Sequence, residues 1–279
     1  MEVVIIVDAL EEMIQRISVT HTQKNLSDCS TSDDECPICH GTGWEVMPDG
    51  GQGTCIECKC GLRQKQIMNS RLSFANIPES FNDVRISNFD ETIYKDDNSK
   101  NKAHTAVKAI KYWLNDFESM QERGMGLYLY SETKGSGKTR MAVSIANELI
   151  YKKKAQVRFS TSLQILNEIK ASWDKRDMEY NESKLLDFLC TSKILVIDDF
   201  GTEQTKDWIG ERFYQIINSR YVDKKITIFT SNSRIDLLKY DNRITNRIKE
   251  RTFQIPFPEE SVRDIIARQN MVKLANGIK

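Results

Sequence analysis

Short apolar segments alternate with longer amphipathic ones from residue 103 onward, and this alternation constrains the fold more than any other feature of the chain. The short runs are typical of buried strands, and the longer segments carry the spacing of apolar residues that favours helices. Strands that alternate with helices of this length form a parallel sheet with helices on both faces. The predicted strands are 127–130, 157–159, 193–198 and 226–230, and the predicted helices are 103–122, 138–152, 162–173, 204–221, 241–250 and 260–274.

The chain before this alternation has a different character. Residues 1–20 carry helical spacing, residues 21–35 are typical of a polar linker, and residues 61–75 predict a basic helix. Residues 96–102 are polar and charged, which predicts a solvent-exposed hinge in front of the first helix of the alternating region.

Charge and hydropathy exclude some classes of protein. The 279 residues include 40 Lys and Arg and 40 Asp and Glu, so the formal net charge is zero. Total charge therefore gives no support to a general polyanion-binding role. No run approaches the roughly 20 apolar residues that span a membrane, and the N-terminus lacks a basic leader. The sequence favours a cytoplasmic protein with no membrane partner.

A glycine-rich segment joins the predicted strand 127–130 to the predicted helix 138–152. Glycines let a backbone wrap closely around a phosphate, and a helix start directs N–H groups and a positive dipole end toward an anion. In this setting Lys138 can reach the β- and γ-phosphates of ATP, and the Thr139 hydroxyl can ligate Mg²⁺. The candidate nucleotide-binding residues are Lys134, Gly135, Ser136, Gly137, Lys138, Thr139 and Arg140.

The first position of this phosphate-binding loop (P-loop) departs from the usual Gly-x-x-x-x-Gly-Lys-Ser/Thr pattern, because Glu132 stands where glycine is expected. Either the loop is one residue longer or its first turn is built differently. A chance match on a surface loop is the alternative, and the position between a strand and a helix argues against it. The departure bears on the rate of hydrolysis more than on nucleotide binding.

Two carboxylates, Asp198 and Asp199, end the apolar strand 193–198. A carboxylate at such a strand end can hold Mg²⁺ through water, and its neighbour can orient or deprotonate the attacking water. We assign Asp198 to Mg²⁺ and Asp199 to the water. The alternative is that one aspartate only caps the following helix.

Polar side chains farther along complete the candidate catalytic set. Asn232 follows the strand 226–230 and could help to position the water, although asparagine there is commonly a turn residue. Arg243 and Arg247 are four residues apart and share one helix face. The pair is either a solvated basic stripe or an arginine finger offered to the ATP of a neighbouring subunit.

Six of the seven cysteines lie between Cys29 and Cys60. A secreted disulfide scaffold would spread its cysteines through the fold, whereas a cluster in a cytosolic chain indicates a metal. Two Cys-x-x-Cys pairs separated by fifteen residues fit a structural zinc site, with unliganded thiols as the alternative. Cys29 stands apart and is expected to be free. Five candidates compete for four ligand positions: Cys36, Cys39, Cys55, Cys58 and Cys60.

Taken together, these motifs resemble the AAA+ ATPase pattern. Within it the chain is similar to the DnaC/DnaI-type replicative helicase loaders and to the related IstB transposition helpers. The resemblance covers roughly residues 36–270. Besides the motifs above, it is carried by Ile197-Asp198-Asp199-Phe200-Gly201-Thr202-Glu203, by Phe213-Tyr214-Gln215-Ile216-Ile217-Asn218-Ser219-Arg220-Tyr221 and by Phe74-Ala75-Asn76-Ile77-Pro78-Glu79-Ser80-Phe81.

The resemblance implies two domains. Residues 1–75 would form an adaptor with a zinc module at 36–60, and residues 76–279 would form an α/β AAA+ domain with a five-stranded parallel sheet. Family members often end the cysteine module in Cys-x-Cys. The implied zinc ligands are therefore Cys36, Cys39, Cys58 and Cys60, with Cys55 as the alternative to Cys58 or Cys60.

The resemblance also assigns roles to single residues. Asn232 would be sensor 1, Arg247 the arginine finger with Arg243 as a helper, and Arg263 would be sensor 2. The implied function is ATP-dependent loading of a hexameric replicative helicase onto single-stranded DNA, in replication initiation, by a homo-oligomer that uses ATP, Mg²⁺ and Zn²⁺.

Two other functions stay open. A transposase helper ATPase would share the core, although helpers of this type generally lack the cysteine module. A nucleotide-gated binding module with little turnover is the second alternative, and Glu132 keeps it open.

Overall fold

The computed structural model describes residues 36–47, 54–173, 178–203 and 206–277. The predicted helix 1–20, the predicted linker 21–35 and Cys29 lie outside the described residues. The chain divides into two compact units, residues 1–67 and residues 68–279, and the division falls inside helix α2 (Leu62–Ala75).

The larger unit is built on a five-stranded sheet in which every pairing is parallel. Its spatial order is β4-β5-β6-β3-β7, so the first of these strands in the chain, β3, lies between β6 and β7. The five-stranded parallel sheet implied by the family resemblance is confirmed. The strands are β3 (Gly126–Tyr130), β4 (Val157–Thr161), β5 (Ile194–Asp198), β6 (Ile226–Ser231) and β7 (Thr252–Pro256).

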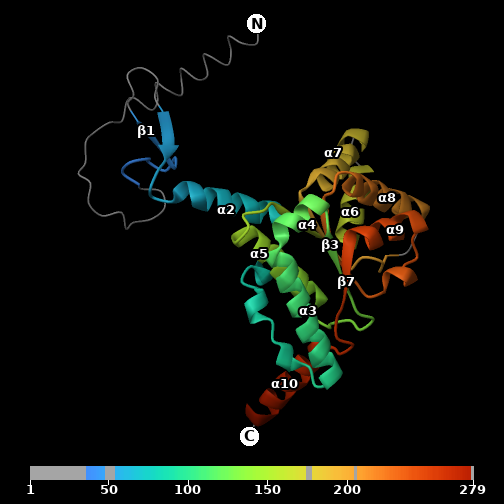
Figure 1. The fold of residues 1–279 in the computed structure, drawn as a ribbon. Helices are drawn as coiled ribbons and strands as arrows, with labels where there is room; N and C mark the ends of the chain where they lie inside the picture. Colours follow the sequence, from blue (N-terminus) through green and yellow to red (C-terminus); the bar gives the residue numbers. More distant parts are fainter. Residues whose placement is uncertain (1–35, 48–53, 174–177, 204–205, 278–279) are drawn as a thin grey trace. The chain divides into compact units, whose positions relative to one another are not determined.

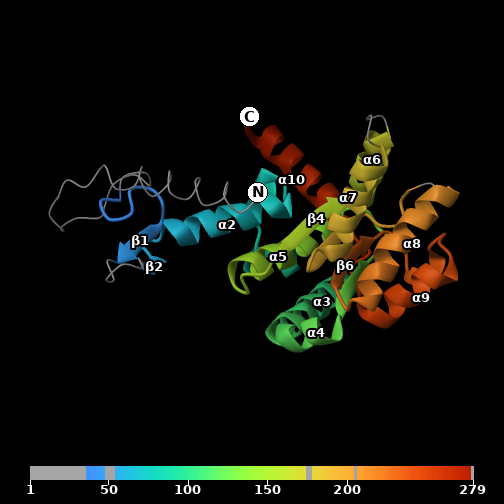
Figure 2. The same ribbon diagram turned by 90° about the horizontal axis from the view of Figure 1, so that it is seen from above.

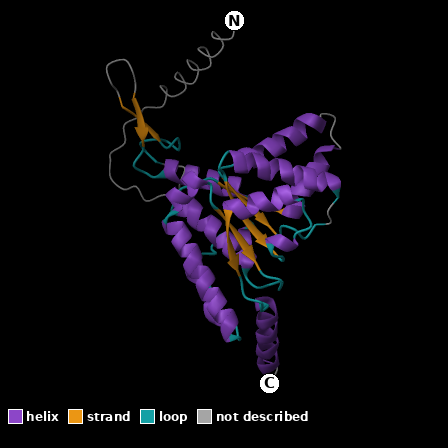
Figure 3. Cartoon of the chain, turned by 45° about the vertical axis from the view of Figure 1, so that its right-hand side comes forward, coloured by secondary structure: helices purple, strands orange, loops and turns teal. Residues whose placement is uncertain are grey.

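Helices cover both faces of this sheet (Figures 1 and 3). Successive strand residues point to opposite faces, so Leu127 and Leu129 pack with α3 and α5, whereas Tyr128 packs with the layer formed by α6, α7, α8 and α9. Figure 2 shows α8 and α9 side by side. The helices of the larger unit after α2 are α3 (Asp97–Asn115), α4 (Phe117–Arg123), α5 (Lys138–Tyr151), α6 (Ser162–Trp173), α7 (Met178–Thr191), α8 (Asp207–Val222), α9 (Asn242–Arg251) and α10 (Val262–Gly277).

The predicted hinge over residues 96–102 is wrong, because α3 already begins at Asp97. The Asp96 carboxylate caps this helix by accepting a hydrogen bond from the Ser99 N–H at 2.9 Å. Only Ser99 is buried in the first turns of the helix. These turns are therefore polar in sequence, which is why they were predicted to be a hinge. A cap can start a helix several residues before its apolar face appears.

Strand β7 and helix α7 were not among the elements predicted from apolar runs. Strand β7 pairs only with β3 and is an edge strand, with Phe253 and Gln254 exposed. An edge strand needs no continuous apolar run, because part of its surface faces solvent. Helix α7 contains several charged residues, which dilute its helical pattern.

The smaller unit contains an antiparallel hairpin of β1 (Trp44–Met47) and β2 (Thr54–Glu57). Its buried side chains form a small cluster of Cys36, Cys39 and Cys58, against which Cys60 and Leu62 pack. This cluster is much smaller than either core of the larger unit. In the described parts of the chain, no helix combines the length and the apolar character needed to cross a membrane.

Candidate nucleotide-binding site and cysteine cluster

The glycine-rich loop lies between the end of β3 and the start of α5. Strand β3 lies where the sheet order reverses, with β6 on one side and the last strand, β7, on the other. Ligands of open parallel sheets bind outside the carboxyl ends of the strands at such a switch point. The fold therefore puts the predicted phosphate-binding loop where an α/β sheet binds its ligands.

Two glycines give this loop its shape. Gly135 and Gly137 have φ angles of 80° and 97°, which side-chain-bearing residues rarely adopt. A Cβ added at Gly137 would also lie 3.1 Å from the Tyr94 hydroxyl, and one at Gly135 would lie 3.0 Å from the Ser261 hydroxyl. The loop backbone is thus tightly enclosed, and the first N–H groups of α5 have no helical partner. This arrangement fits a bound phosphate.

The Lys138 ammonium is held inside the loop. Its Nζ donates hydrogen bonds to the carbonyl oxygens of Ser131 and Thr133, at 3.2 Å and 3.0 Å, and to the Ser136 hydroxyl at 3.1 Å. Burial lowers the pKa of Lys138, while nearby carboxylates, among them Asp199 and Glu259, partly offset that effect. All three acceptors are neutral, so the buried cation would gain strongly from an anionic phosphate.

Asp198 lies directly beside the start of α5. It accepts hydrogen bonds from the Thr139 hydroxyl at 3.0 Å and from the Thr230 hydroxyl at 2.5 Å. Burial raises the pKa of Asp198, and Asp199 adds to the rise, whereas the two threonine hydroxyls oppose it. A hydroxyl and a carboxylate oxygen side by side are ligands that Mg²⁺ accepts, and a dication there would stabilise the buried carboxylate.

Asp199 has a different environment from its neighbour. Its side chain is exposed, its φ is 53°, and its N–H donates to the Thr230 hydroxyl at 2.9 Å. Its carbonyl oxygen accepts hydrogen bonds from Ser162 and Thr202. Several contacts thus hold an uncommon backbone conformation, which separates one buried carboxylate from one exposed carboxylate. The hydroxyl of Thr230 contacts both aspartates.

Two more side chains contact the loop and were not predicted from the sequence. The Tyr94 hydroxyl donates to the Ser136 carbonyl oxygen at 2.8 Å, and Glu259 accepts hydrogen bonds from the start of the loop. Neither lies in a motif. The only sequence signal near Glu259 is its closeness to the proposed sensor 2 segment.

The structure also places the other candidates. Arg263 lies beside the loop, since its Cγ would be 3.2 Å from a Cβ at Gly135. Asn232 is half-buried and directly follows β6. Lys134 and Arg140 are exposed, and Arg140 donates to the Asn88 carbonyl oxygen at 3.5 Å.

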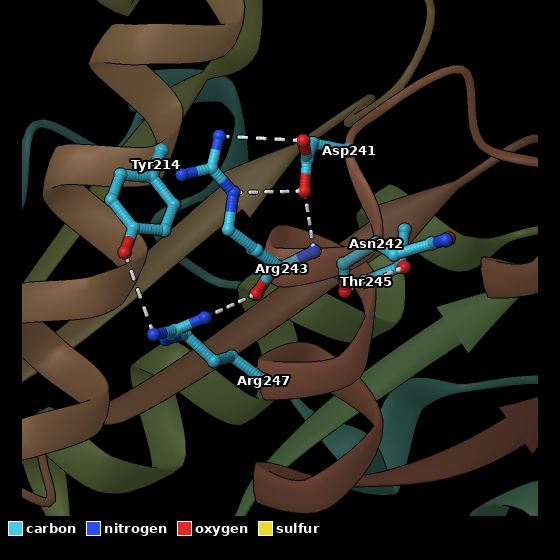
Figure 4. Close-up of polar contacts among 6 residues, drawn as sticks. All are labelled: Tyr214, Asp241, Asn242, Arg243, Thr245 and Arg247. Carbon is cyan, nitrogen blue, oxygen red and sulfur yellow. Dashed lines mark hydrogen bonds and ion pairs between the residues drawn. The ribbon is translucent and has the colours of Figure 1, made fainter.

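Arg243 and Arg247 form one cluster on α9 with Tyr214 of α8 (Figure 4). Both guanidinium groups lie over the Tyr214 ring, at 4.9 Å and 5.2 Å from its centroid. Arg247 donates to the Arg243 carbonyl oxygen at 2.7 Å, and Arg243 pairs with Asp241 at 3.1 Å. Among the described residues, the contacts of both arginines are with α8, with α9 and with its N-cap, rather than with the P-loop.

The cysteine cluster has the dimensions of a metal site. The Sγ atoms of Cys36, Cys39, Cys58 and Cys60 all lie within 4.8 Å of one another. The Cys36–Cys58 and Cys39–Cys60 separations are 3.7 Å and 3.6 Å. Tetrahedral zinc with Zn–S bonds of about 2.3 Å would put its sulfurs about 3.8 Å apart. Cys55 is exposed on β2 and takes no part in the cluster.

The ionisation of these thiols is uneven. Burial raises the pKa of Cys58 to about 12 and also raises that of Cys39. Burial opposes the charge on Cys36 as well, but hydrogen bonds from the Cys39 and Ile38 backbone lower its pKa to about 6. Closely packed thiols cannot all carry charge by themselves. A dication would relieve that repulsion, so the donor set fits Zn²⁺.

Comparison with known proteins agrees with a nucleotide-binding site at the glycine-rich loop. Residues 125–251 match the family described as IstB-like ATP binding protein. The chain is 30% identical over 202 residues to the uncharacterized protein YqaM of Bacillus subtilis (strain 168), a match that covers 70% of this chain and 60% of YqaM. It is 25% identical over 131 residues to the replicative helicase loader DnaC of Escherichia coli (strain K12), covering 47% of this chain and 51% of DnaC.

Solved structures share the fold. A crystal structure of DnaI has a TM-score of 0.54 with 24% identity, covering 65% of this chain and 94% of that one. A crystal structure of the DnaC helicase loader also has a TM-score of 0.54 with 24% identity, covering 64% and 99%. Residues 125–251 thus resemble the IstB-like ATP binding family, and the larger unit shares the fold of DnaI and DnaC.

The match to the IstB-like ATP binding family does not reach every feature of the chain. It includes the P-loop, both aspartates, Asn232 and the arginine pair, but it ends before Arg263 and begins after the cysteine cluster. The chain also spans only 60% of YqaM and 51% of DnaC, whereas it spans 81% of the phage-like element PBSX protein XkdC of Bacillus subtilis (strain 168), at 23% identity.

Proposed function

We propose that this AAA+ protein binds ATP with Mg²⁺ and hydrolyses it. The observation that carries the proposal is the direct contact between Thr139, at the start of α5, and Asp198, at the end of β5, next to the buried Lys138. These residues are 59 positions apart, and the fold brings together a cation for phosphate and two oxygen ligands for a metal.

The roles follow from the environments. Lys138 and the loop N–H groups would bind the β- and γ-phosphates, and Thr139 with Asp198 would hold Mg²⁺. Mg²⁺ would neutralise the charge that develops on the phosphate oxygens. Asp199 is exposed, so its carboxylate would orient the attacking water, and Asn232 at the end of β6 would assist.

Two arginine sites would contact bound nucleotide, one in its own subunit and the other in a neighbouring subunit. Arg263 lies beside Gly135 and would contact the phosphates of its own subunit. Arg247, with Arg243 as a helper, would reach the ATP of a neighbouring subunit, because its contacts within this chain are remote from the P-loop. A finger supplied to a neighbour requires the protein to form a homo-oligomer.

The work of this ATPase would be to load a hexameric replicative helicase onto single-stranded DNA. Similarity to the helicase loader DnaC and the fold shared with DnaI support this role. The cysteine cluster, with zinc on Cys36, Cys39, Cys58 and Cys60, would shape an N-terminal adaptor for the helicase. Such a protein would act in the cytoplasm, and similarity to XkdC fits a replicon of phage type.

A transposase helper is the second candidate, favoured by the IstB-like match of the core. The cysteine cluster favours the loader, because it supplies an adaptor that the core alone lacks. A nucleotide-gated switch with little turnover is the third, and it depends on the effect of Glu132 on the loop.

The experiment is a measurement of ATP hydrolysis with and without single-stranded DNA and the cognate replicative helicase. We expect stimulated hydrolysis that falls at least about 100-fold in Lys138→Ala and in Arg247→Ala. Matched controls are Lys152→Ala, at the other end of α5, and Lys249→Ala, exposed on α9, which should both behave like the wild type.

The outcomes separate the candidates. Tight ATP binding without turnover under any condition would favour the switch. Stimulation by a transposase, and not by a helicase, would favour the transposition helper. Hydrolysis that survives Lys138→Ala unchanged would contradict the proposed site.

A further inference from the structure

The start of the P-loop lacks the usual first glycine, and a carboxylate from the far end of the chain contacts it instead. We infer that Glu259 is a positioning residue that fixes Ser131, Glu132 and Thr133 for nucleotide binding, a role that rests on the proposed ATP site. Glu259 lies in the connector between β7 and α10, over 120 residues from the loop.

The contacts of Glu259 cover all three residues. Its Oε1 accepts a hydrogen bond from the Glu132 N–H at 3.2 Å, and its Oε2 accepts from the Thr133 N–H at 2.9 Å and from the Ser131 hydroxyl at 3.0 Å. A carboxylate that accepts several such bonds in one place fixes both the distance and the direction of the backbone it holds.

The same backbone segment holds the essential cation of the proposed site. The carbonyl oxygens of Ser131 and Thr133 are two of the three acceptors of Lys138. Glu259 thus holds the N–H side of a segment whose C=O side holds the Lys138 ammonium. A shift at Glu259 would pass to Lys138 through one short stretch of backbone, without any intermediate side chain.

The rest of the connector strengthens this link. The Phe257 N–H donates to the Tyr130 carbonyl oxygen at 2.7 Å, and the Val262 N–H donates to the Gly135 carbonyl oxygen at 3.0 Å. Glu259 lies between these two contacts in the chain, so the connector follows the loop from its first residue to its glycines. Arg263, next to Val262, is held beside Gly135 by the same arrangement.

The charge of Glu259 is suited to this position. Burial raises its pKa, but the hydrogen bonds from Ser131, Thr133 and Glu132 outweigh burial and hold the pKa of the carboxyl below its usual value. Glu259 is therefore ionised at neutral pH. Its negative charge also favours the charged form of Lys138. The N–H groups of Glu132 and Thr133 are engaged by Glu259, which leaves later N–H groups of the loop for phosphate.

The expected kinetic effect is specific. The loop would contact phosphate both in bound ATP and in the transition state. A loop that is less well fixed should therefore bind the ground state and the transition state more weakly by the same amount. A loss of that kind raises KM and leaves kcat unchanged. Replacement of a catalytic residue would instead lower kcat, so the division between the two constants distinguishes positioning from catalysis.

The test compares Glu259→Gln and Glu259→Ala with the wild-type full-length protein, using titration with ATP and with ADP, and steady-state hydrolysis. Gln keeps one accepting oxygen and loses the other together with the charge. We expect the dissociation constants and KM to rise about 10-fold, which corresponds to about 1.4 kcal/mol, with kcat within about 2-fold of the wild type. Glu118→Gln, an exposed carboxylate paired with Lys153, is the matched control and should bind ATP like the wild type.

A second variant covers the case in which Glu259 variants fail to fold, as judged by melting without nucleotide. Ser131→Ala removes one donor to the carboxylate from the other side and should raise KM about 3-fold. Wild-type affinity in Glu259→Gln or in Ser131→Ala, or a fall in kcat with unchanged KM, would overturn the inference and leave the ATP site intact. Failure of the wild type to bind ATP would overturn the proposed function itself, and this inference with it.

Discussion

The P-loop and the cysteine cluster are both tight arrangements of polar groups, but they are stabilised by different means. The loop, residues 131–137, stands on a sheet whose strands and helices bury two large apolar cores. The cluster is supported by three buried cysteines, with Cys60 and Leu62 packed against them. A small apolar cluster cannot offset the conformational entropy of an ordered module, so we expect the cysteine unit to depend on the proposed zinc, whereas the loop should keep its shape without a metal.

The comparison teaches where each site is vulnerable. A site that rests on an apolar core is lost when buried packing or buried hydrogen bonds are removed. A site that rests on metal ligands is lost when one ligand is removed, whatever happens to the rest of the chain. Four experiments test this contrast.

The largest effect is expected at the cysteine cluster. Cys58→Ser removes one of the proposed zinc ligands, and since structural zinc contributes on the order of 10 kcal/mol to folding of small modules, the cysteine segment should lose its structure and its zinc. Zinc content and proteolysis of this segment are the measurements. Cys55→Ser, on an exposed cysteine 3 positions away, should keep both properties. Full protection of the segment in metal-free protein would remove the contrast between the two regions.

The next effect is expected at Arg220, which is fully buried in the larger unit. Its guanidinium donates to the carbonyl oxygens of Leu189, Ser192 and Ile226, and burial lowers its pKa to about 9. Arg220→Ala leaves these acceptors unsatisfied and should reduce the free energy of unfolding by about 3 kcal/mol. Urea denaturation measures this, with the exposed Arg234→Ala as the control. A loss below about 0.5 kcal/mol, as at an ordinary surface site, would show that the large core tolerates the change.

Asp198→Asn should weaken hydrolysis about 100-fold, or about 2.7 kcal/mol, by removing the proposed Mg²⁺ ligand. The same change should raise the melting temperature without nucleotide, because burial raises the pKa of Asp198. A raised folded-state pKa means that ionisation costs stability above the unfolded pKa, so the gain should be present at pH 7 and shrink as the pH falls toward about 4.

The control for that experiment is Asp199→Asn. The Asp199 side chain is exposed, so its charge costs little stability by burial. Hydrolysis should therefore fall without a rise in melting temperature. A lower melting temperature for Asp198→Asn would mean that the two threonine hydrogen bonds outweigh burial of the charge.

The smallest effect is expected at the arginine cluster on α8 and α9. Tyr214→Ala removes the ring under Arg243 and Arg247, a contact of about 0.5–1 kcal/mol at exposed sites, and should lower helicase-stimulated hydrolysis about 3-fold. Tyr214→Phe keeps the ring and loses only a 3.5 Å hydrogen bond, so it should stay within about 2-fold. Tyr112→Ala, exposed on α3, is the control. Equal losses in both Tyr214 variants would assign the effect to the hydroxyl rather than to the ring.

The sequence predicted most of the sheet because buried parallel strands have an unmistakable apolar pattern. Strand β5 is buried at every position, and the four strands predicted from apolar runs are all present. Edge strand β7 was not predicted because its exposed positions break that pattern. The start of α3 was not predicted because a capped polar turn resembles a loop in sequence. Local signals fail where an element depends on a cap or on a neighbouring strand.

The residues of the candidate site likewise fall into two groups, those in local motifs and those known only from contacts between distant segments. Lys138, Thr139 and Asp198 stand in local motifs whose residue types dictate their chemistry, and the structure brings the three together. Glu259 and Tyr94 lie in no motif, and they contact residues 42 to 128 positions away in the chain. The choice of Cys60 over Cys55 came from family resemblance, and the fold separates them by exposing one and clustering the other.

The sequence by itself determined the parallel α/β architecture, the phosphate-binding loop, the two carboxylates and a cysteine-rich module, because each depends on residues close in the chain. Only the tertiary structure decided which carboxylate is buried, which cysteines meet, and how a loop without its first glycine is held. Those outcomes depend on the order of strands in the sheet and on contacts between distant segments. No spacing within the chain encodes such contacts, because burial and proximity arise only when the chain is packed.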